Sequence, residues 1–332
     1  MHSYKVQTTD HLNLHVTHWY KIENSKGTLC IIHGLGEHQE RYAHVAKFYS
    51  ENGFNVFSYD QRGHGKSEGK RGHSPGIEFN LDDLERVIKT IPKEHLFIYG
   101  HSFGGNVLAN FLLRKQPKCL SGAILSSAWL ELAKQPNILE FAMANVMNKI
   151  VPGFTQNSKI DAKLLSNDPS VCEAYVTDPL NHDKISVRLF SDFYAAGKWA
   201  IKNANKLPVE TLLVHGADDG IISSHGTVEF TENSKGLAKC KIFENTKKLL
   251  GLIGEETISD LKCLKNCIHW ELNLLSDLGF GLELSKCIVT GSDKELSFVS
   301  PKSGKAVCNK VGMPYKNKLL ILPRFLGGII QN

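Results

Sequence analysis

Residues 97–105 read Phe-Ile-Tyr-Gly-His-Ser-Phe-Gly-Gly, and this stretch decides the fold predicted for the chain. An apolar strand is predicted over 95–99, and a helix is predicted over 106–114. Between them, Gly100 and Gly104 would let the strand and the helix approach each other closely around a strained serine, Ser102. The pattern G-x-S-x-G in this setting predicts a serine hydroxyl pushed up from the end of a sheet, where it can act as a nucleophile.

The segments on both sides of this turn alternate between strands and helices. Further strands are predicted over 12–16, 28–32, 55–59, 122–126, 210–216 and 240–243, and further helices over 41–52 and 81–91. Such alternation is typical of a parallel sheet with right-handed crossovers. The alternation stops between about 131 and 207, where helical stretches with four prolines predict a cap inserted between two strands. The sequence therefore predicts an α/β fold, with a mostly parallel sheet flanked by helices and a helical cap insertion.

Beyond about residue 247 the alternation does not return, and the prediction divides the chain into domains at 1–247 and 248–332. The chain has 332 residues, 42% of them hydrophobic and 22% charged, as in an ordinary globular protein. The net charge of +5 does not by itself indicate nucleic acid. Residues 296–332 nevertheless hold six basic side chains and no acidic one: Lys302, Lys305, Lys310, Lys316, Lys318 and Arg324. A solvated face is the favoured interpretation, and a nucleic-acid partner is not expected.

The chain shows no sign of export. Its first residues are polar, and no apolar run approaches the roughly 18 residues of a transmembrane helix. The eight cysteines are scattered, which favours free thiols in a reducing cytoplasm over a disulfide framework. Cys263 and Cys267 lack a convincing second pair of ligands, so no zinc site is predicted. We expect a cytoplasmic protein without a metal.

Several segments together resemble the monoacylglycerol lipase branch of the α/β-hydrolases, often catalogued as serine aminopeptidase S33-like or lysophospholipase. They are His-Gly-Leu-Gly-Glu-His at 33–38, Tyr-Asp-Gln-Arg-Gly-His-Gly-Lys-Ser at 59–67, the serine turn at 100–105, Glu-Ala-Tyr-Val-Thr-Asp-Pro-Leu at 173–180 and Val-His-Gly-Ala-Asp-Asp at 214–219. The resemblance covers residues 1 to about 246 in order. Because the motifs stand in register, it is far more specific than G-x-S-x-G alone.

The resemblance implies an α/β-hydrolase fold and a role for each matching residue. Ser102 would attack an ester carbonyl, and the backbone N–H groups of Leu35 and Phe103 would bind the resulting oxyanion. Asp218 and Asp219 are both candidates for the acid that orients the base, and the family register favours Asp219. The implied substrates are acylglycerols or lysophospholipids, and no cofactor is implied.

The catalytic histidine of that family is missing. It would follow the strand at 241–244 by four residues, where this chain has Lys248. A lysine with its usual pKa near 10 is protonated and does not accept the serine proton. His225 follows Asp219 too closely for the family's order, and His269 belongs to a different segment, so neither is expected to replace it. Turnover is therefore expected to be nearly absent.

The remainder of the chain has a second resemblance, to the C-terminal helical part of the recombination mediator RecO. It rests on the segments 270–287, 298–307 and 314–326, with Ser-Pro-Lys-Ser-Gly at 300–304 as its core, and it covers about 255–326. It implies a mainly helical or irregular fragment. RecO's N-terminal oligonucleotide-binding barrel has no counterpart here, so at most weak single-strand binding is expected. Gene fusion, a frameshift and an assembly error would each join two such segments.

Two further segments invite a functional interpretation. Residues 63–67, Gly-His-Gly-Lys-Ser, end like a phosphate-binding loop, but Asp60 stands where that motif needs a glycine, so no nucleotide site is predicted. Residues 138–147 are apolar at helical spacing. Core packing is the favoured interpretation for this stripe; an acyl-chain tunnel and peripheral membrane contact through the cap are the alternatives.

Overall fold

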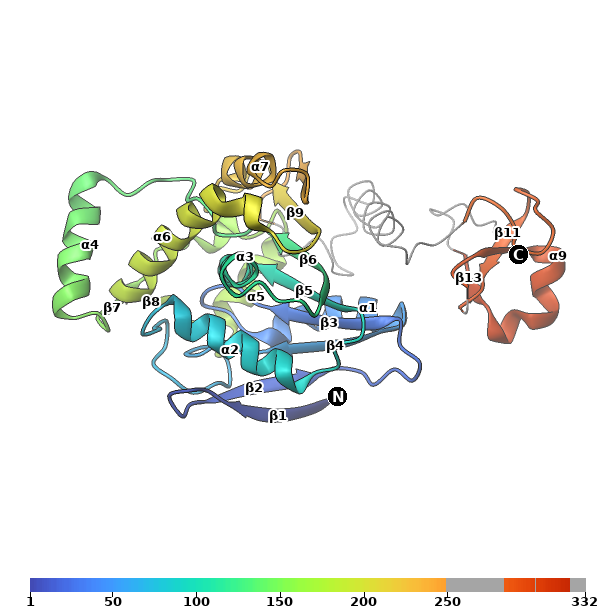
Figure 1. Cartoon of the computed structure of the whole chain (residues 1–332), viewed down its shortest axis with the longest axis horizontal. Coiled ribbons are helices and arrows are strands. Elements are labelled where there is room, and N and C mark those ends of the chain that lie inside the picture. The colour runs from blue at the N-terminus through green and yellow to red at the C-terminus, as the bar shows by residue number, and fades with distance from the viewer. Residues whose placement is uncertain (249–283, 302, 323–332) are drawn as a thin grey trace. The chain divides into compact units, whose positions relative to one another are not determined.

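The structure is a computed structural model that describes residues 1–248, 284–301 and 303–322 (Figure 1). The chain divides into two compact units, Met1–Glu255 and Glu256–Asn332. Each unit has its own hydrophobic core, so each is described by itself. Cys263, Cys267 and His269, on which the sequence prompted predictions, lie outside the described residues.

The first unit is built on an eight-stranded sheet in the order β1-β2-β4-β3-β5-β6-β9-β10. β2 runs antiparallel to β1 and β4, and the other neighbours are parallel. The strands are β1 His2–Gln7, β2 Asn13–His18, β3 Gly27–Ile32, β4 Phe54–Tyr59, β5 Leu96–His101, β6 Leu120–Ser126, β9 Thr211–Gly216 and β10 Ala238–Phe243. Every residue of β3, β4 and β5 is buried, as expected for central strands covered on both faces. The predicted mostly parallel sheet is confirmed; β1 is a strand that the sequence did not reveal.

The helices α2 Ile77–Thr90, α3 Phe103–Lys115, α6 Val187–Asn203 and α7 Ser224–Asn233 contact one another in series, and α1 Ala43–Glu51 packs against β4. The central helix α3 buries nearly all of its residues, because it lies directly behind β5 and beneath α6 (Figure 1). Short 3-10 helices precede α1 at Gln39–Tyr42 and follow α6 at Ala204–Lys206. The flanking helices thus fix the end of β5, from which Ser102 emerges.

The cap lies between β6 and β9. It contains α4 Ile138–Ile150, the short antiparallel pair β7 Thr155–Asn157 and β8 Lys184–Ser186, a 3-10 turn at Ala162–Leu164, and α5 Pro169–Thr177. Asp168 caps α5 by accepting the Ser170 N–H, and Pro169 begins the helix. The helix α6, inside the same stretch of sequence, instead packs on α3 and contributes Phe193 to the core.

The apolar stripe on α4 does not form core at the positions where its side chains are described. Met143 and Val146 are 59% and 57% exposed, and Ile150 is also exposed. Met143 and Met147 also line the cavity described below. The favoured interpretation of core packing is therefore wrong for these positions, because α4 packs beside α6 and away from the sheet (Figure 1). No helix among the described residues is both long and apolar enough to cross a membrane.

The described part of the second unit contains a three-stranded antiparallel sheet in the order β12-β11-β13. Its elements are β11 Leu296–Val299, β12 Ala306–Cys308, α9 Asn309–Gly312, a 3-10 segment at Met313–Lys318, and β13 Leu320–Ile321. Phe298 fills the centre of the small core, and Gly312 lies against its ring. This sheet was not apparent from the sequence. The six cysteines in the described residues are free thiols.

Candidate active site

Ser102 stands in a strained turn between β5 and α3. Its φ of 51° and ψ of −112° lie outside the conformations that L-residues ordinarily adopt. The turn depends on two glycines. A Cβ on Gly100 would lie 2.6 Å from the Gly104 carbonyl oxygen, and a Cβ on Gly104 would collide with the carbonyl oxygen of Ile32. The predicted close approach of strand and helix around a strained serine is therefore present.

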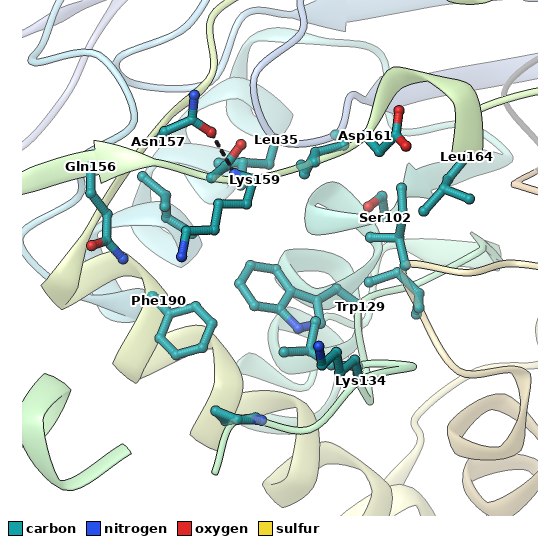
Figure 2. A pocket seen from close by; sticks show the side chains of 18 of the residues that line it. Leu35, Ser102, Trp129, Lys134, Gln156, Asn157, Lys159, Asp161, Leu164 and Phe190 are labelled. Carbon is teal, nitrogen blue, oxygen red and sulfur yellow. Dashed lines mark hydrogen bonds between the residues drawn. The ribbon is translucent and has the colours of Figure 1, made fainter. Parts of the chain in front are cut away.

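Ser102 opens into a cavity of about 810 Å³ between the sheet and the cap. Leu35 and Lys248 line the same cavity, whereas Phe103 is fully buried behind Ser102. Figure 2 shows the aromatic side chains of Trp129 and Phe190 facing the space next to Ser102. Most of the remaining wall is apolar and comes from the cap. The cavity can therefore take a ligand with a long apolar part beside a reactive head.

The loop that carries Leu35 is held by Glu37. The Glu37 Oε1 atom accepts the Gly34 N–H at 2.6 Å and the Tyr42 hydroxyl at 2.7 Å, and Oε2 accepts from Arg41 Nε at 3.0 Å. Burial raises the pKa of Glu37, but the Arg41 guanidinium and neighbouring groups outweigh burial and lower the pKa to about 2. Sequence reasoning assigned Glu37 no role. The available signal was an acidic residue four positions before a basic one, although Glu37 lies in the loop before the 3-10 helix Gln39–Tyr42.

The buried His33 also stabilises the loop that carries Leu35. His33 Nδ1 lies 2.7 Å from the Gly34 carbonyl, and its Nε2 accepts the Gln61 N–H at 2.9 Å. Burial lowers the pKa of His33, so the ring stays neutral and can accept this bond. In the described part of the chain, the backbone N–H groups of Leu35 and Phe103 donate no hydrogen bond to a side chain or to a loop carbonyl. These two backbone N–H groups are thus available to donate hydrogen bonds to a ligand.

Of the two candidate acids, Asp219 is buried and Asp218 is exposed. Asp219 Oδ1 accepts the N–H groups of Ile221 and Ile222 at 2.9 Å each, and Oδ2 lies 3.4 Å from His215 Nε2. Burial raises the pKa of Asp219, but the nearby Lys248 charge and these donors lower it to about 2. Asp219 is therefore an ionised carboxylate at the end of β9.

The loop at 244–248 crosses directly over that strand end. The Ala217 N–H donates to the Phe243 carbonyl and the Asp218 N–H to the Thr246 carbonyl, both at 2.9 Å. A Cβ on Gly216 would collide with the carbonyl oxygens of Thr246 and Lys247, so only glycine fits beneath the loop. The loop also touches the cap, because the Asn167 side-chain amide donates to the Asn245 carbonyl at 2.9 Å.

Lys248 is the last described residue of this loop and lies in the wall of the cavity with only 6% of its surface exposed. Burial lowers the pKa of its ammonium group, and the carboxylates of Asp219 and Glu37 oppose that shift. No carboxylate in the described residues lies within the 4.0 Å of an ion pair from its nitrogen. The position where the sequence led us to expect a histidine therefore holds a buried lysine whose pKa is lowered.

Among the described residues that line the cavity, His101 is the histidine, and it directly precedes Ser102 in the sequence. Burial lowers the pKa of His101 to about 3, and the positive charge of Lys248 adds to that effect. His101 is thus a very weak base. His225 is largely exposed and lies 3.3 Å from Glu131 Oε2, away from the cavity wall. The expectation that His225 does not replace the missing base agrees with this position.

The segment at 63–67 wraps around a buried carboxylate. Asp60 Oδ2 accepts the Lys66 N–H at 2.8 Å, and the Ser67 hydroxyl donates to the Asp60 carbonyl at 2.5 Å. A Cβ on Gly65 would collide with the Asp60 carboxyl group. The residue that breaks the phosphate-loop pattern therefore organises this turn.

Comparison with known families gives two matches on one chain. Residues 23–246 match the family described as serine aminopeptidase, S33, and residues 236–332 match the C-terminal family of recombination protein O. The two matches overlap over 236–246, which includes the last strand of the large sheet. The sequence therefore changes from hydrolase-like to RecO-like within residues 236–246, just before Lys248.

Individual relatives agree with this division. An uncharacterised abhydrolase domain-containing protein of Dictyostelium discoideum is 35% identical over 67% of this chain, which spans about a quarter (24%) of that protein. The crystal structure of a Paleococcus ferrophilus monoacylglycerol lipase is similar with a TM-score of 0.69 and 28% identity, covering 84% of this chain and all of that one. The DNA repair protein RecO of Bartonella bacilliformis is 61% identical over 59 residues, 18% of this chain and 24% of that protein.

Proposed function

Because the chain belongs to the serine aminopeptidase S33 family of α/β-hydrolases, we propose that its residues 1–247 carry a serine-hydrolase site for carboxylic esters of acylglycerols or lysophospholipids. In this proposal Ser102 is the nucleophile, Leu35 and Phe103 supply the oxyanion donors, and Asp219 is the acid. The observation that carries the proposal is the strained Ser102, which opens into an apolar cavity beside Leu35. The resemblance to a monoacylglycerol lipase supports an acylglycerol as the substrate class.

The proposed chemistry is acyl transfer through the serine. Ser102 Oγ loses its proton and bonds to the ester carbonyl carbon, and the carbonyl oxygen becomes an oxyanion. The N–H groups of Leu35 and Phe103 would stabilise that charge, a contribution of about 3 kcal/mol per donor in well-studied hydrolases. The carbon–alkoxy bond then breaks, the alcohol leaves with a proton, and water hydrolyses the acyl-serine to the free acid. The proposal requires no metal or organic cofactor.

The missing element is a base for the serine proton. Lys248 stands at the expected histidine position, where burial lowers the pKa of its amine, and His101 is too weak a base to compensate. Removing a triad histidine costs on the order of 10⁶ in kcat, and a residual acceleration of about 10³–10⁴ over water remains. The first candidate function is therefore a very slow esterase at neutral pH. The buried lysine in place of the expected histidine favours a second candidate, a catalytically inactive hydrolase fold that retains its acyl cavity.

Hydrolysis of a p-nitrophenyl ester and of a monoacylglycerol by the full chain tests the proposal. We expect slow turnover that disappears in Ser102→Ala. Rapid turnover abolished by Ser102→Ala would show that another group serves as the base. Turnover that is unchanged by Ser102→Ala would contradict the assignment of the nucleophile, and no turnover at all would favour the inactive fold.

The RecO-like region is proposed to contribute no annealing activity. Of the six basic side chains in residues 296–332, Lys305, Lys310, Lys316 and Lys318 belong to the described residues, and all are at the surface or only partly buried. Backbone-directed contacts of this kind give weak, salt-sensitive binding without sequence preference.

A further inference from the structure

We propose that the cavity beside Ser102 is a binding site for a free long-chain carboxylate, whose head is bound by Lys248 and whose chain lies against the apolar wall of the cap. This inference rests on the acyl cavity of the proposed function but not on turnover by Ser102. In the hydrolase the acid is a product that must leave. Here the residue that replaces the base would retain it.

The first argument is the state of Lys248. Its side chain is more than nine-tenths buried, it lines the cavity, and no described residue forms a hydrogen bond or ion pair with its ammonium group. This ammonium group, which has no partner among the described residues, can donate a charge-assisted hydrogen bond to a carboxylate ligand at this position.

The two nearby carboxylates differ in how far their contacts occupy them. Glu37 is bound by Arg41, Tyr42 and the Gly34 N–H. Asp219 Oδ1 accepts two backbone N–H groups, whereas Asp219 Oδ2 is buried without a hydrogen-bond partner in the described residues. Both carboxylates are close enough to favour the charged form of Lys248, but neither is at ion-pair distance. No described carboxylate therefore forms a direct ion pair with the Lys248 nitrogen.

The second argument is that further donors surround the head of the cavity. The N-terminus of the 13-residue helix α3 begins at Phe103, and its first turn contains no acidic side chain. The helix dipole and the N–H groups of Leu35 and Phe103 favour negative charge at this point. An ester carbonyl would use these donors only partly, whereas a carboxylate can accept from them and from Lys248 with its two oxygens.

The third argument is the wall that would receive the chain. Its volume of about 810 Å³ is within the range of cavities that enclose small apolar ligands. The cap contributes apolar side chains to it, among them Leu132, Met143, Met147, Phe154, Leu164 and Phe190. A small inorganic anion would leave this wall empty, so the ligand that fits both ends is a fatty acid.

The experiment compares palmitate with hexadecanol, which has the same chain but no charge. Both are titrated into the full chain below their aggregation concentrations, with displacement of a fluorescent fatty-acid probe as the signal. Wild-type protein is expected to bind palmitate at least about 10-fold more tightly than hexadecanol, since a hydrogen bond to a charged group is worth that much or more. Lys248→Met should remove this preference and leave hexadecanol binding unchanged. Lys247→Met is the matched control, because the Lys247 side chain reaches the Lys163 carbonyl instead of the cavity.

Each other outcome overturns the proposal. Equal affinity of the wild type for the two ligands would mean that Lys248 does not bind the head, as would a preference for palmitate that survives in Lys248→Met. Hexadecanol binding shows that Lys248→Met is folded, and Lys248→Gln provides a polar second variant. If neither ligand binds, the carboxylate site is refuted. Labelling of Ser102 by a fluorophosphonate then reports separately whether the proposed hydrolase site is intact.

Discussion

The buried side chain of Lys248 and the hydroxyl-bearing Ser102 share the wall of one cavity, although they are far apart in the sequence. Ser102 is placed by the turn after β5, and Lys248 by the loop that crosses the end of β9. The two strand ends meet at the same edge of the sheet, because β5, β6 and β9 are parallel neighbours. Both side chains therefore face the cavity from this edge of the sheet.

We predict that Lys248→His increases ester hydrolysis at neutral pH by about 10²- to 10⁴-fold, the usual contribution of a positioned general base. Asp219 is already ionised and buried near this position, so it can orient an imidazole. The measurement is p-nitrophenyl ester turnover, with Lys247→His as the matched control. A folded Lys248→His protein without any gain would argue against the assigned histidine position.

We predict that a fluorophosphonate labels the wild-type protein slowly and Ser102→Ala not at all. The strained turn exposes the hydroxyl to the cavity, but no described group removes its proton efficiently. Gel-based labelling over time measures the rate. Equal labelling of Ser102→Ala would identify another reactive residue and contradict the proposal for the nucleophile.

Glu37 is predicted to make the free energy of unfolding of the first unit decrease at acidic pH. Its pKa in the folded state is about 2, below the ordinary value of 4.5, so its contribution is complete above about pH 4.5 and is lost as the pH falls towards 2. The shift corresponds to about 3 kcal/mol at neutral pH. Glu37→Gln should lower the free energy of unfolding at pH 7 by about that amount and flatten its decline below pH 4.5, measured by urea unfolding. Glu85→Gln, at an exposed pair on α2, is the control and should change it little.

The glycine behind the serine turn is predicted to be indispensable. In Gly104→Ala the new methyl group would meet the carbonyl oxygens of Ile32 and His33, which belong to β3 and its exit and have no room to shift. We expect a loss of at least about 1–3 kcal/mol in the free energy of unfolding, as for overpacked cores. Gly153→Ala, where the nearest atom is 3.8 Å away, should be close to neutral. Equal unfolding midpoints for the two variants would refute the close packing.

Single-stranded DNA is predicted to bind weakly and with little selectivity. The four described lysines in residues 296–332 could contact only a few phosphates, and each contact changes the logarithm of the binding constant by about −0.7 per decade of salt. Fluorescence anisotropy of a labelled oligonucleotide, with and without Lys310→Gln, Lys316→Gln and Lys318→Gln together, measures this. Submicromolar binding at physiological salt that is lost in the triple variant would make the RecO-like segment a functional DNA-binding element.

The sequence predicted the parts of the site that short-range chemistry controls. Gly100 and Gly104 identified the serine turn, because only glycine fits where strand and helix touch. The sequence did not reveal that Glu37 braces the loop of Leu35, because that bond joins side chain to backbone within a loop. The sequence also did not reveal that Met143 and Val146 are exposed. An apolar stripe on a helix has the same spacing whether it faces a core or the mouth of a cavity. Nor could periodicity show that Lys248 is buried.

The crossing of residues 244–248 over Gly216 has a consequence for how such chains can be recombined. The Ala217 and Asp218 N–H groups recognise only the peptide backbone above them, so this loop can be held whatever side chains it carries. A foreign segment joined at this loop would therefore keep the backbone path over Gly216 and bring a new side chain to the buried position 248. For protein engineering, the end of β9 is therefore a suitable junction. Substituting residue 248 there would change the reactivity of the site while the backbone stays the same.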